Sequence, residues 1–277
     1  MTTRCPALQR VYRCFGTTIR LRATTAALLE AMIATLPPRA TRVRASARPD
    51  VRLFLRGAGP CGCGQHHHRT ILFLGARLHA SGSLDALLDH CRQITKFRVA
   101  ERARHVFVHA GVVAWRGRII LMPGRSGAGK TTLVMALVRA GATYYSDEYA
   151  VIDAAGLVHP FPQHLGVRDP GVALPRRVPV SALGWRAGTT PLPVGLVLLT
   201  SYRRSARWQA RPLSRARAVF AVLPHAVQHA THPARVMSRL GTALSGALTV
   251  EARRGDVEAA VAFALGSLKA PRIVDFR

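Results

Sequence analysis

Hydrophobic and polar positions alternate differently on the two sides of residue 100 or so, and the second part carries the clearer pattern. Apolar runs at 106–115 and 118–122, joined by Arg116-Gly117, predict two adjacent strands with a tight turn. A helical pattern follows over 130–140 and ends at Gly141, the residue type favoured at a helix C-terminus. Further strands are predicted at 142–145 and 194–200, and a last helix at 257–268. The alternation of strand and helix indicates an α/β core.

The first part of the chain has shorter apolar segments. Its pattern predicts helices at 24–36 and 83–94 and strands at 51–55 and 71–74. Between those strands, residues 57–68 are rich in Gly, Cys and His, which is typical of a loop. We therefore expect a separate, smaller α/β unit before the core.

A glycine-rich loop lies between the strand at 118–122 and the helix at 130–140. It matches the phosphate-binding pattern G-x-x-x-x-G-K-[ST] at every fixed position, in the order Gly124, Arg125, Ser126, Gly127, Ala128, Gly129, Lys130 and Thr131. Its glycines allow successive backbone N–H groups to converge on phosphate oxygens. The helix adds its positive N-terminal end, so the expected phosphate-binding segment extends to Thr132. We expect Lys130 to bind the β- and γ-phosphates of ATP and Thr131 to bind Mg²⁺.

An adjacent pair of acids, Asp147 and Glu148, follows the predicted strand at 142–145. Neighbouring carboxylates repel each other unless a cation or a proton lies beside them, and Mg²⁺ that arrives with a nucleotide would supply that charge. One carboxylate can then hold the metal while the other accepts a proton from an attacking hydroxyl. Asp147 comes only 17 positions after Lys130, which leaves room for one helix and one strand.

Composition changes this picture mainly through charge. The 277 residues include 40 Lys and Arg against 13 Asp and Glu, a formal net charge of +27. Such a field attracts acidic partners. We expect an acidic protein or peptide rather than nucleic acid, because the arginine-rich C-terminal third lacks interleaved aromatic residues and a recognisable nucleic-acid-binding module. No segment has the ~18 consecutive apolar residues of a membrane-spanning helix. An odd count of five cysteines in the first third favours a reducing cytoplasm.

The stretch 109–152, HAGVVAWRGRIILMPGRSGAGKTTLVMALVRAGATYYSDEYAVI, resembles the core of HPr kinase/phosphorylase and its relatives. In that family a His-containing segment precedes a strand hairpin, a G-x-S-G-x-G-K-[ST] loop, a short helix and an acidic pair. The resemblance is specific over residues 105–162. It implies an α/β protein with a PEP-carboxykinase-like P-loop kinase domain at 103–277. Residues 1–102 carry no motif of the family, and from their apolar pattern we expect a smaller α/β accessory domain.

The resemblance also implies an activity and roles for individual residues. The implied activity is that of an Mg-ATP-dependent kinase, which transfers the γ-phosphoryl group to a hydroxyl. We expect this hydroxyl to belong to a serine of a protein or peptide. Lys130 and Thr131 would handle Mg-ATP, Asp147 and Glu148 would share metal binding and base catalysis, and His109 would lie near the phosphoryl site. The family's relatives assemble into rings, so a homo-oligomer is also implied.

Two departures from the family leave questions open. The usual Asp-Asp pair is Asp147-Glu148 here, so either residue can be the base. The segment HLGVRDP at 164–170 differs from the family's Arg-Gly-containing signature, so the sequence does not establish the reverse, phosphorylase reaction. Two alternatives to a kinase stay in view: an ATP-binding regulatory switch without phosphoryl transfer, and a nucleic-acid-associated ATPase, which is suggested by charge alone. Arg203, Arg204 and Arg207 are candidates for stabilising phosphoryl charge.

Overall fold

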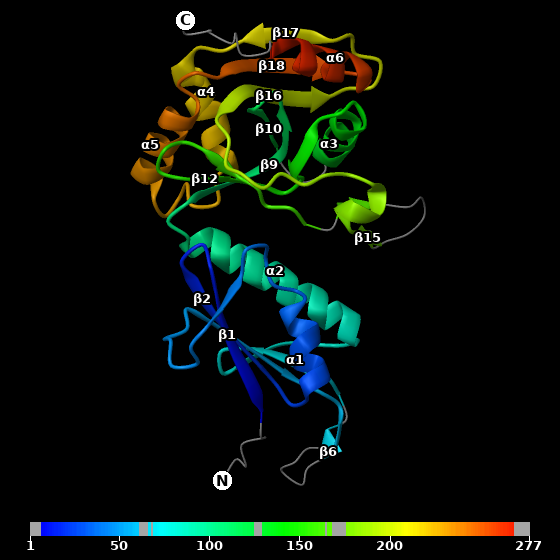
Figure 1. Cartoon of the computed structure of the whole chain (residues 1–277), viewed down its shortest axis with the longest axis vertical. Coiled ribbons are helices and arrows are strands. Elements are labelled where there is room, and N and C mark those ends of the chain that lie inside the picture. Colours follow the sequence, from blue (N-terminus) through cyan, green and yellow to red (C-terminus); the bar gives the residue numbers. More distant parts are fainter. Residues whose placement is uncertain are drawn as a thin grey trace, which may run out of the picture. The chain divides into compact units, whose positions relative to one another are not determined.

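A computed structural model describes residues 7–60, 66–67, 69–124, 129–163, 165–167 and 176–268. The chain forms two compact units, Met1–Arg104 and His105–Arg277 (Figure 1). This boundary lies two residues beyond the one expected from the sequence. Both units combine helices with a mixed β-sheet, so the α/β class is correct. Within the described residues, no helix is long and apolar enough to cross a membrane.

The first unit contains a six-stranded sheet in the order β3-β1-β2-β4-β7-β8. Two helices, α1 and α2, pack against buried side chains of this sheet such as Ile19, Leu21 and Leu53. The side-chain oxygens of Thr25 and Ser83 accept from backbone N–H groups in the first turns of α1 and α2, which explains where both helices begin. The elements are β1 Leu8–Cys14, β2 Thr17–Ala23, α1 Ala26–Ile33, β3 Thr41–Val43, β4 Val51–Arg56, β5 Gly59–Pro60, β6 His66–His67, β7 Ile71–Leu74, β8 Arg77–Ser81 and α2 Leu84–Arg102.

The second unit is built on a larger sheet in the order β13-β12-β9-β10-β16-β18-β17, with β11 also paired to β9. Strands β10, β16 and β18 are parallel, whereas β9 runs antiparallel to β10. The elements are β9 Val106–Trp115, β10 Arg118–Pro123, α3 Lys130–Arg139, β11 Thr143–Ser146, β12 Tyr149–Ile152, β13 Val158–His159, β14 Leu165–Val167, β15 Arg176–Val178, η1 Val180–Leu183, β16 Val194–Tyr202, β17 Gln209–Pro212, α4 Arg215–Val222, η2 Leu223–His225, α5 Pro233–Ala243, β18 Leu248–Arg254 and α6 Glu258–Ser267.

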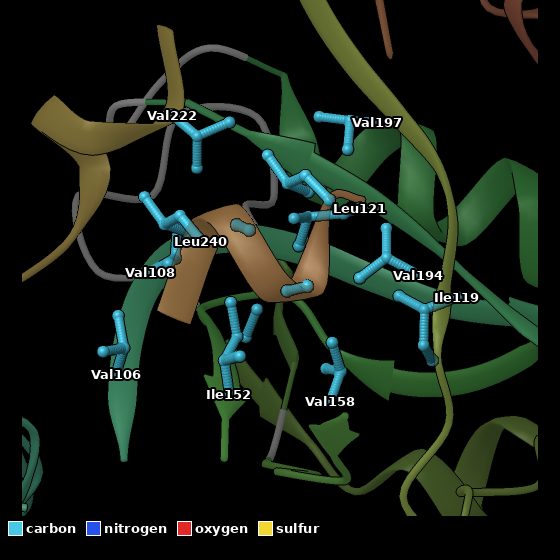
Figure 2. Close-up of a cluster of buried hydrophobic side chains, with 14 of the residues drawn as sticks. Val106, Val108, Ile119, Leu121, Ile152, Val158, Val194, Val197, Val222 and Leu240 are labelled. Atoms are coloured by element: carbon cyan, nitrogen blue, oxygen red, sulfur yellow. The ribbon is translucent and has the colours of Figure 1, made fainter. Parts of the chain in front are cut away.

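Helices cover both faces of this second sheet, which is why its central strands are continuous apolar runs. On one face, alternate residues of β9 such as Val106 and Val108 pack with Val222 of α4 and Leu240 of α5 (Figure 2). On the other face, Val113 of β9 packs with residues of α3 and α6. The central strands of this sheet are therefore buried on both sides.

Most predicted elements of the second unit lie within a residue or two of the observed ones. The 106–115 strand coincides with β9, and the turn after it has positive φ at both Arg116 (50°) and Gly117 (74°), as a two-residue hairpin requires. The prediction for residues 83–94 was too short, since α2 continues to Arg102. The loop predicted at 57–68 lies partly outside the described residues but contains the short strands β5 and β6. The sequence reasoning missed β1, β2, β12, β18, α4 and α5.

Candidate functional site

The site forms where three parallel strands end. Because β10, β16 and β18 run in the same direction, their C-terminal ends lie at one edge of the sheet. The chain leaves β10 at Gly124, whose backbone N–H donates to the carbonyl oxygen of His109 at 3.1 Å. This edge is where open α/β sheets usually bind ligands. Arg125, Ser126, Gly127 and Ala128, predicted to bind phosphate, lie outside the described residues.

The chain re-enters the described structure at Gly129, which is the N-cap of α3. Its φ of 75° and ψ of 18° lie in the left-handed region that glycine adopts without strain. A glycine has no side chain to accept from the first N–H groups of the helix, so the helix start keeps donors for an anion. Lys130, Thr131 and Thr132 form the first turn, with Lys130 and Thr131 half-buried and Thr132 exposed.

The acidic pair interrupts a strand that runs beside β9. β11 and β12 both pair antiparallel with β9, and Asp147 and Glu148 are the two residues between them. The Ala110 N–H donates to the Glu148 carbonyl at 3.1 Å, so strand pairing continues through the pair. The Ser146 hydroxyl oxygen accepts from the N–H groups of Glu148 (3.2 Å) and Tyr149 (3.0 Å). The backbone of the acidic pair is thus held by both β9 and Ser146.

Two hydroxyls orient the carboxylate of Asp147. Thr131 Oγ1 donates to Asp147 Oδ2 at 3.4 Å, which links the first turn of α3 to the acidic pair. Tyr144 donates its phenol proton to Asp147 Oδ1 at 2.9 Å, and its oxygen also lies 3.4 Å from the Gln163 carbonyl. Burial and the neighbouring Asp147 raise the pKa of Tyr144 well above its ordinary value. Tyr144 therefore stays protonated and keeps donating.

Lys130 lies in the field of both acids. Burial lowers the pKa of Lys130, while the carboxylates of Asp147 and Glu148 act in the opposite direction because they favour the ammonium form. The structure thus brings Lys130, Thr131, Asp147 and Glu148 together, although the acids are separated from the helix start by a helix and a strand in the sequence.

His109 lies at the same edge. It is inside β9, within the strand predicted at 106–115, and it pairs with Tyr149 of β12. Its side chain is exposed, and its ring centroid is 4.7 Å from that of Tyr149. Because its carbonyl oxygen accepts from Gly124, His109 lies level with the start of the glycine-rich loop.

Gly111 allows β9 to approach the first turn of α3. A Cβ at this position would lie 2.7 Å from Val134 Cγ2, 3.3 Å from Met122 Cε and 3.6 Å from Lys130 Cβ. The first two separations are shorter than ordinary contact between carbon atoms, and the third is an ordinary contact. The missing side chain therefore fixes how closely Lys130 packs against the strand that pairs with the acidic residues.

The sequence reasoning missed Arg254, the last residue of β18. Only 4% of Arg254 is exposed, and its Nη2 donates to the Gly129 carbonyl at 3.2 Å. Its guanidinium carbon lies 5.6 Å from the ring centroid of Tyr202, and its buried Nε has no hydrogen-bond partner among the described residues. Burial lowers the pKa of Arg254, with Tyr202 acting in the opposite direction. One arginine among so many basic residues gives no local signal.

The arginines that were singled out from the sequence are placed differently. Arg203, Arg204 and Arg207 follow β16 and are all exposed. Of these residues, the backbone N–H of Arg203 donates to the Arg254 carbonyl at 3.0 Å. They lie beyond the C-terminal end of β16, whereas the side-chain contact that the described residues show with the glycine-rich loop comes from Arg254 of β18, at Gly129.

A cation at this site would be coordinated by few protein oxygens. Among the residues that the structure describes, no group of three or more His, Cys, Asp or Glu could hold a metal ion by itself. Thr131 Oγ1 and Asp147 Oδ2, 3.4 Å apart, are oxygen ligands of the kind that Mg²⁺ prefers. Mg²⁺ usually takes only one or two protein ligands beside phosphate oxygens, so these residues fit that role.

Comparison with known proteins does not identify the chain. No protein-family model matches its sequence, and no curated protein matches it at a significant level.

Proposed function

We propose that this protein is an Mg-ATP-dependent kinase that transfers the γ-phosphoryl group to a hydroxyl, a serine of a protein or peptide, on a PEP-carboxykinase-like P-loop fold. The observation that carries the proposal is the hydrogen bond of 3.4 Å between Thr131 and Asp147. It joins the residue expected to bind Mg²⁺ in the loop motif to the acid expected to bind the same ion. The two lie 16 positions apart and are brought together by the pairing of β11 and β12 with β9.

The residues at the sheet edge have distinct roles in this proposal. Mg-ATP supplies the phosphoryl group and the cation that offsets its charge. Gly129 and the start of α3 present N–H groups to the phosphates, and Lys130 adds a positive charge beside them. Arg254 supports the loop from the adjacent strand end through the Gly129 carbonyl, and its buried positive charge also favours a polyphosphate there.

The contacts of Asp147 suggest how the two acids divide their work. Both of its carboxylate oxygens accept hydrogen bonds, one from Thr131 and one from Tyr144, which holds the carboxylate in a fixed orientation suited to a metal ligand. Glu148 is then the group that removes the proton from the acceptor hydroxyl. His109, exposed at the same edge, is available to contact the transferring group or the acceptor.

A phosphoryl-transfer assay tests the proposal. Wild-type protein, Lys130→Ala and Asp147→Asn/Glu148→Gln would each be incubated with ATP labelled at the γ-phosphate and with protein and peptide extracts of the native host. We expect a labelled acceptor with wild type, and a loss of at least about 100-fold with both variants. Glu251→Gln is the matched control, since it removes one negative charge from an exposed position of β18.

The two ways of failing have different meanings. If ATP binds in a Lys130-dependent manner but no label moves to any acceptor, the protein is an ATP-binding regulatory switch and not a kinase. If ATP does not bind at all, the assignment of the glycine-rich loop is wrong as well. Equilibrium binding of a fluorescent ATP analogue, measured on the same variants, separates these two outcomes.

A further inference from the structure

One face of the sheet in the first unit is not covered by α1 or α2, the described helices of that unit. Helices α1 and α2 contact each other and pack on the side where Ile19, Leu21 and Leu55 are fully buried. Side chains alternate between the two sides of a strand, so the intervening residues point to the opposite side. That opposite side carries the set Arg20, Arg22, Arg52, Phe54, Arg56 and Phe73, which we call the Arg–Phe face.

Aromatic rings hold two of these arginines in place. Phe54 and Phe73 are opposite each other on β4 and β7, with ring centroids 5.6 Å apart and an interplanar angle of 22°. The guanidinium carbon of Arg22 lies 5.3 Å from the Phe54 centroid, and that of Arg56 lies 5.4 Å from the Phe73 centroid. A guanidinium stacked on a ring has fewer conformations to lose when its N–H groups bind an acceptor.

The arginines of the Arg–Phe face lack acidic partners. None of the ion pairs formed by the described residues includes Arg20, Arg22, Arg52 or Arg56. The Nε atom of Arg56 is buried without a hydrogen-bond partner in the described part of the chain. Arg22 and Arg52 are exposed, and like charges on neighbouring strands repel one another. A negatively charged occupant would remove this repulsion.

We propose that the Arg–Phe face binds an acidic peptide segment in an extended conformation. Arg52 and Arg56 lie four residues apart on β4 and point to the same side, about 13 Å apart along the strand. An extended peptide with acidic residues at every second position presents carboxylates at this spacing, and these can accept bidentate hydrogen bonds from the two arginines. Arg22 extends the basic surface to β2, whereas Arg20 already donates from Nη2 to the carbonyl oxygens of Ala45 (3.2 Å) and Ala47 (3.4 Å).

The aromatic geometry favours a peptide over a single-stranded nucleic acid. Nucleic-acid-binding sheets present open aromatic faces on which bases stack. Here Phe54 and Phe73 are half-buried, stack against each other and lie beneath guanidinium groups. The face therefore offers guanidinium N–H groups rather than bare rings. Any connection between this segment and the phosphoryl acceptor rests on the proposed kinase function, whereas binding itself does not.

Binding of a synthetic probe to the full-length protein tests the proposal. The probe is a fluorescein-labelled peptide of alternating Glu and Ser, measured by fluorescence anisotropy without ATP at physiological salt. We expect Arg22→Glu/Arg56→Glu to lower its affinity at least about tenfold. Arg211→Glu/Arg217→Glu makes the same change of charge at exposed positions of the second unit, and should leave the affinity within about twofold of wild type.

A milder pair of variants tests the geometry without a charge reversal. Arg22→Lys/Arg56→Lys keeps the charge but removes the planar fork, so affinity should fall about threefold or more. Equal losses in the Arg–Phe face variant and the control would overturn the proposal, because they would show attraction by net charge alone. An oligothymidylate that binds and loses affinity in the face variants, while the peptide does not bind, would also overturn it and assign the face to nucleic acid.

Discussion

Replacing Gly111 with alanine tests whether close packing of β9 on α3 positions the phosphate-binding residues. The new methyl group would lie 2.7 Å from Val134 Cγ2, whereas carbon atoms prefer about 3.5–4.0 Å, so neighbouring atoms must move by roughly 1 Å. Overpacking of this kind costs about 1–3 kcal/mol. Val134 belongs to α3, so its displacement strains the helix whose first turn contains Lys130, the Cβ of which lies 3.6 Å from the same point. We expect ATP affinity to fall about tenfold, since a shift of this size at a binding group is costly.

Urea unfolding followed by tryptophan fluorescence measures the loss of stability. All three tryptophans, at positions 115, 185 and 208, belong to the second unit, so the signal reports on the unit that contains the site. The expected loss corresponds to a decrease of roughly 0.5–2 M in the urea midpoint.

Gly241→Ala is the matched control for this experiment. Gly241 lies within α5, and a Cβ there would meet no atom within 4 Å. That variant should be stabilised by about 0.5–1 kcal/mol and bind ATP normally. If Gly111→Ala were as stable as wild type and bound ATP equally well, the proposed role of the contact would be wrong.

Three further outcomes are expected. Arg254→Ala should weaken ATP binding about tenfold or more and Arg254→Lys should restore only part of it, whereas the exposed Arg253→Ala should bind normally in the same equilibrium titration. Tyr144→Phe removes a donor to the carboxylate proposed to bind the metal, so the Mg²⁺ concentration for half-maximal phosphoryl transfer should rise about 10-fold while the circular dichroism spectrum stays native. Burial raises the pKa of Cys14 and of Cys91 to about 12, partly offset by nearby arginines, so neither thiol should react with iodoacetamide at pH 8 until urea unfolds the protein, as read by peptide mass spectrometry. Because both values are raised above about 8.5 in the unfolded chain, the stability contributed by these neutral thiols is complete below that pH and declines as pH rises toward 12.

Local signals carried the sequence predictions that succeeded. The turn at Arg116-Gly117, the strand at 106–115 and the helix beginning at Lys130 are each specified by contiguous residues, and all three appear in the structure. The hairpin of β1 and β2 has an equally local turn, Phe15-Gly16, with φ of 46° and 87°. It was missed although arginines alternate with apolar residues on β2, which is the period-two pattern of a strand with one side away from the core.

Functional residues that depend on strand pairing could not be predicted in the same way. Tyr144 has the sequence pattern of an ordinary buried strand residue, yet its hydroxyl reaches Asp147 just beyond a register shift in β11 between Tyr144 and Ser146. Arg254 contacts a residue 125 positions away. The Phe54 and Phe73 rings meet because β4 pairs with β7 in one particular register. A shift of one residue would point these side chains to the other face.

The sequence by itself determined the local chemistry: a phosphate-binding loop motif, an acidic pair shortly after it, an α/β alternation and a large positive charge. These features depend on neighbours in the chain, where backbone preferences and periodicity act directly. Only the tertiary structure decided that Arg254 contacts Gly129, which hydroxyls orient Asp147 and which face of the first sheet α1 and α2 leave uncovered. The physical reason is that strand order and register arise from burial and hydrogen bonding summed over the whole sheet, and no short segment of the sequence contains that sum.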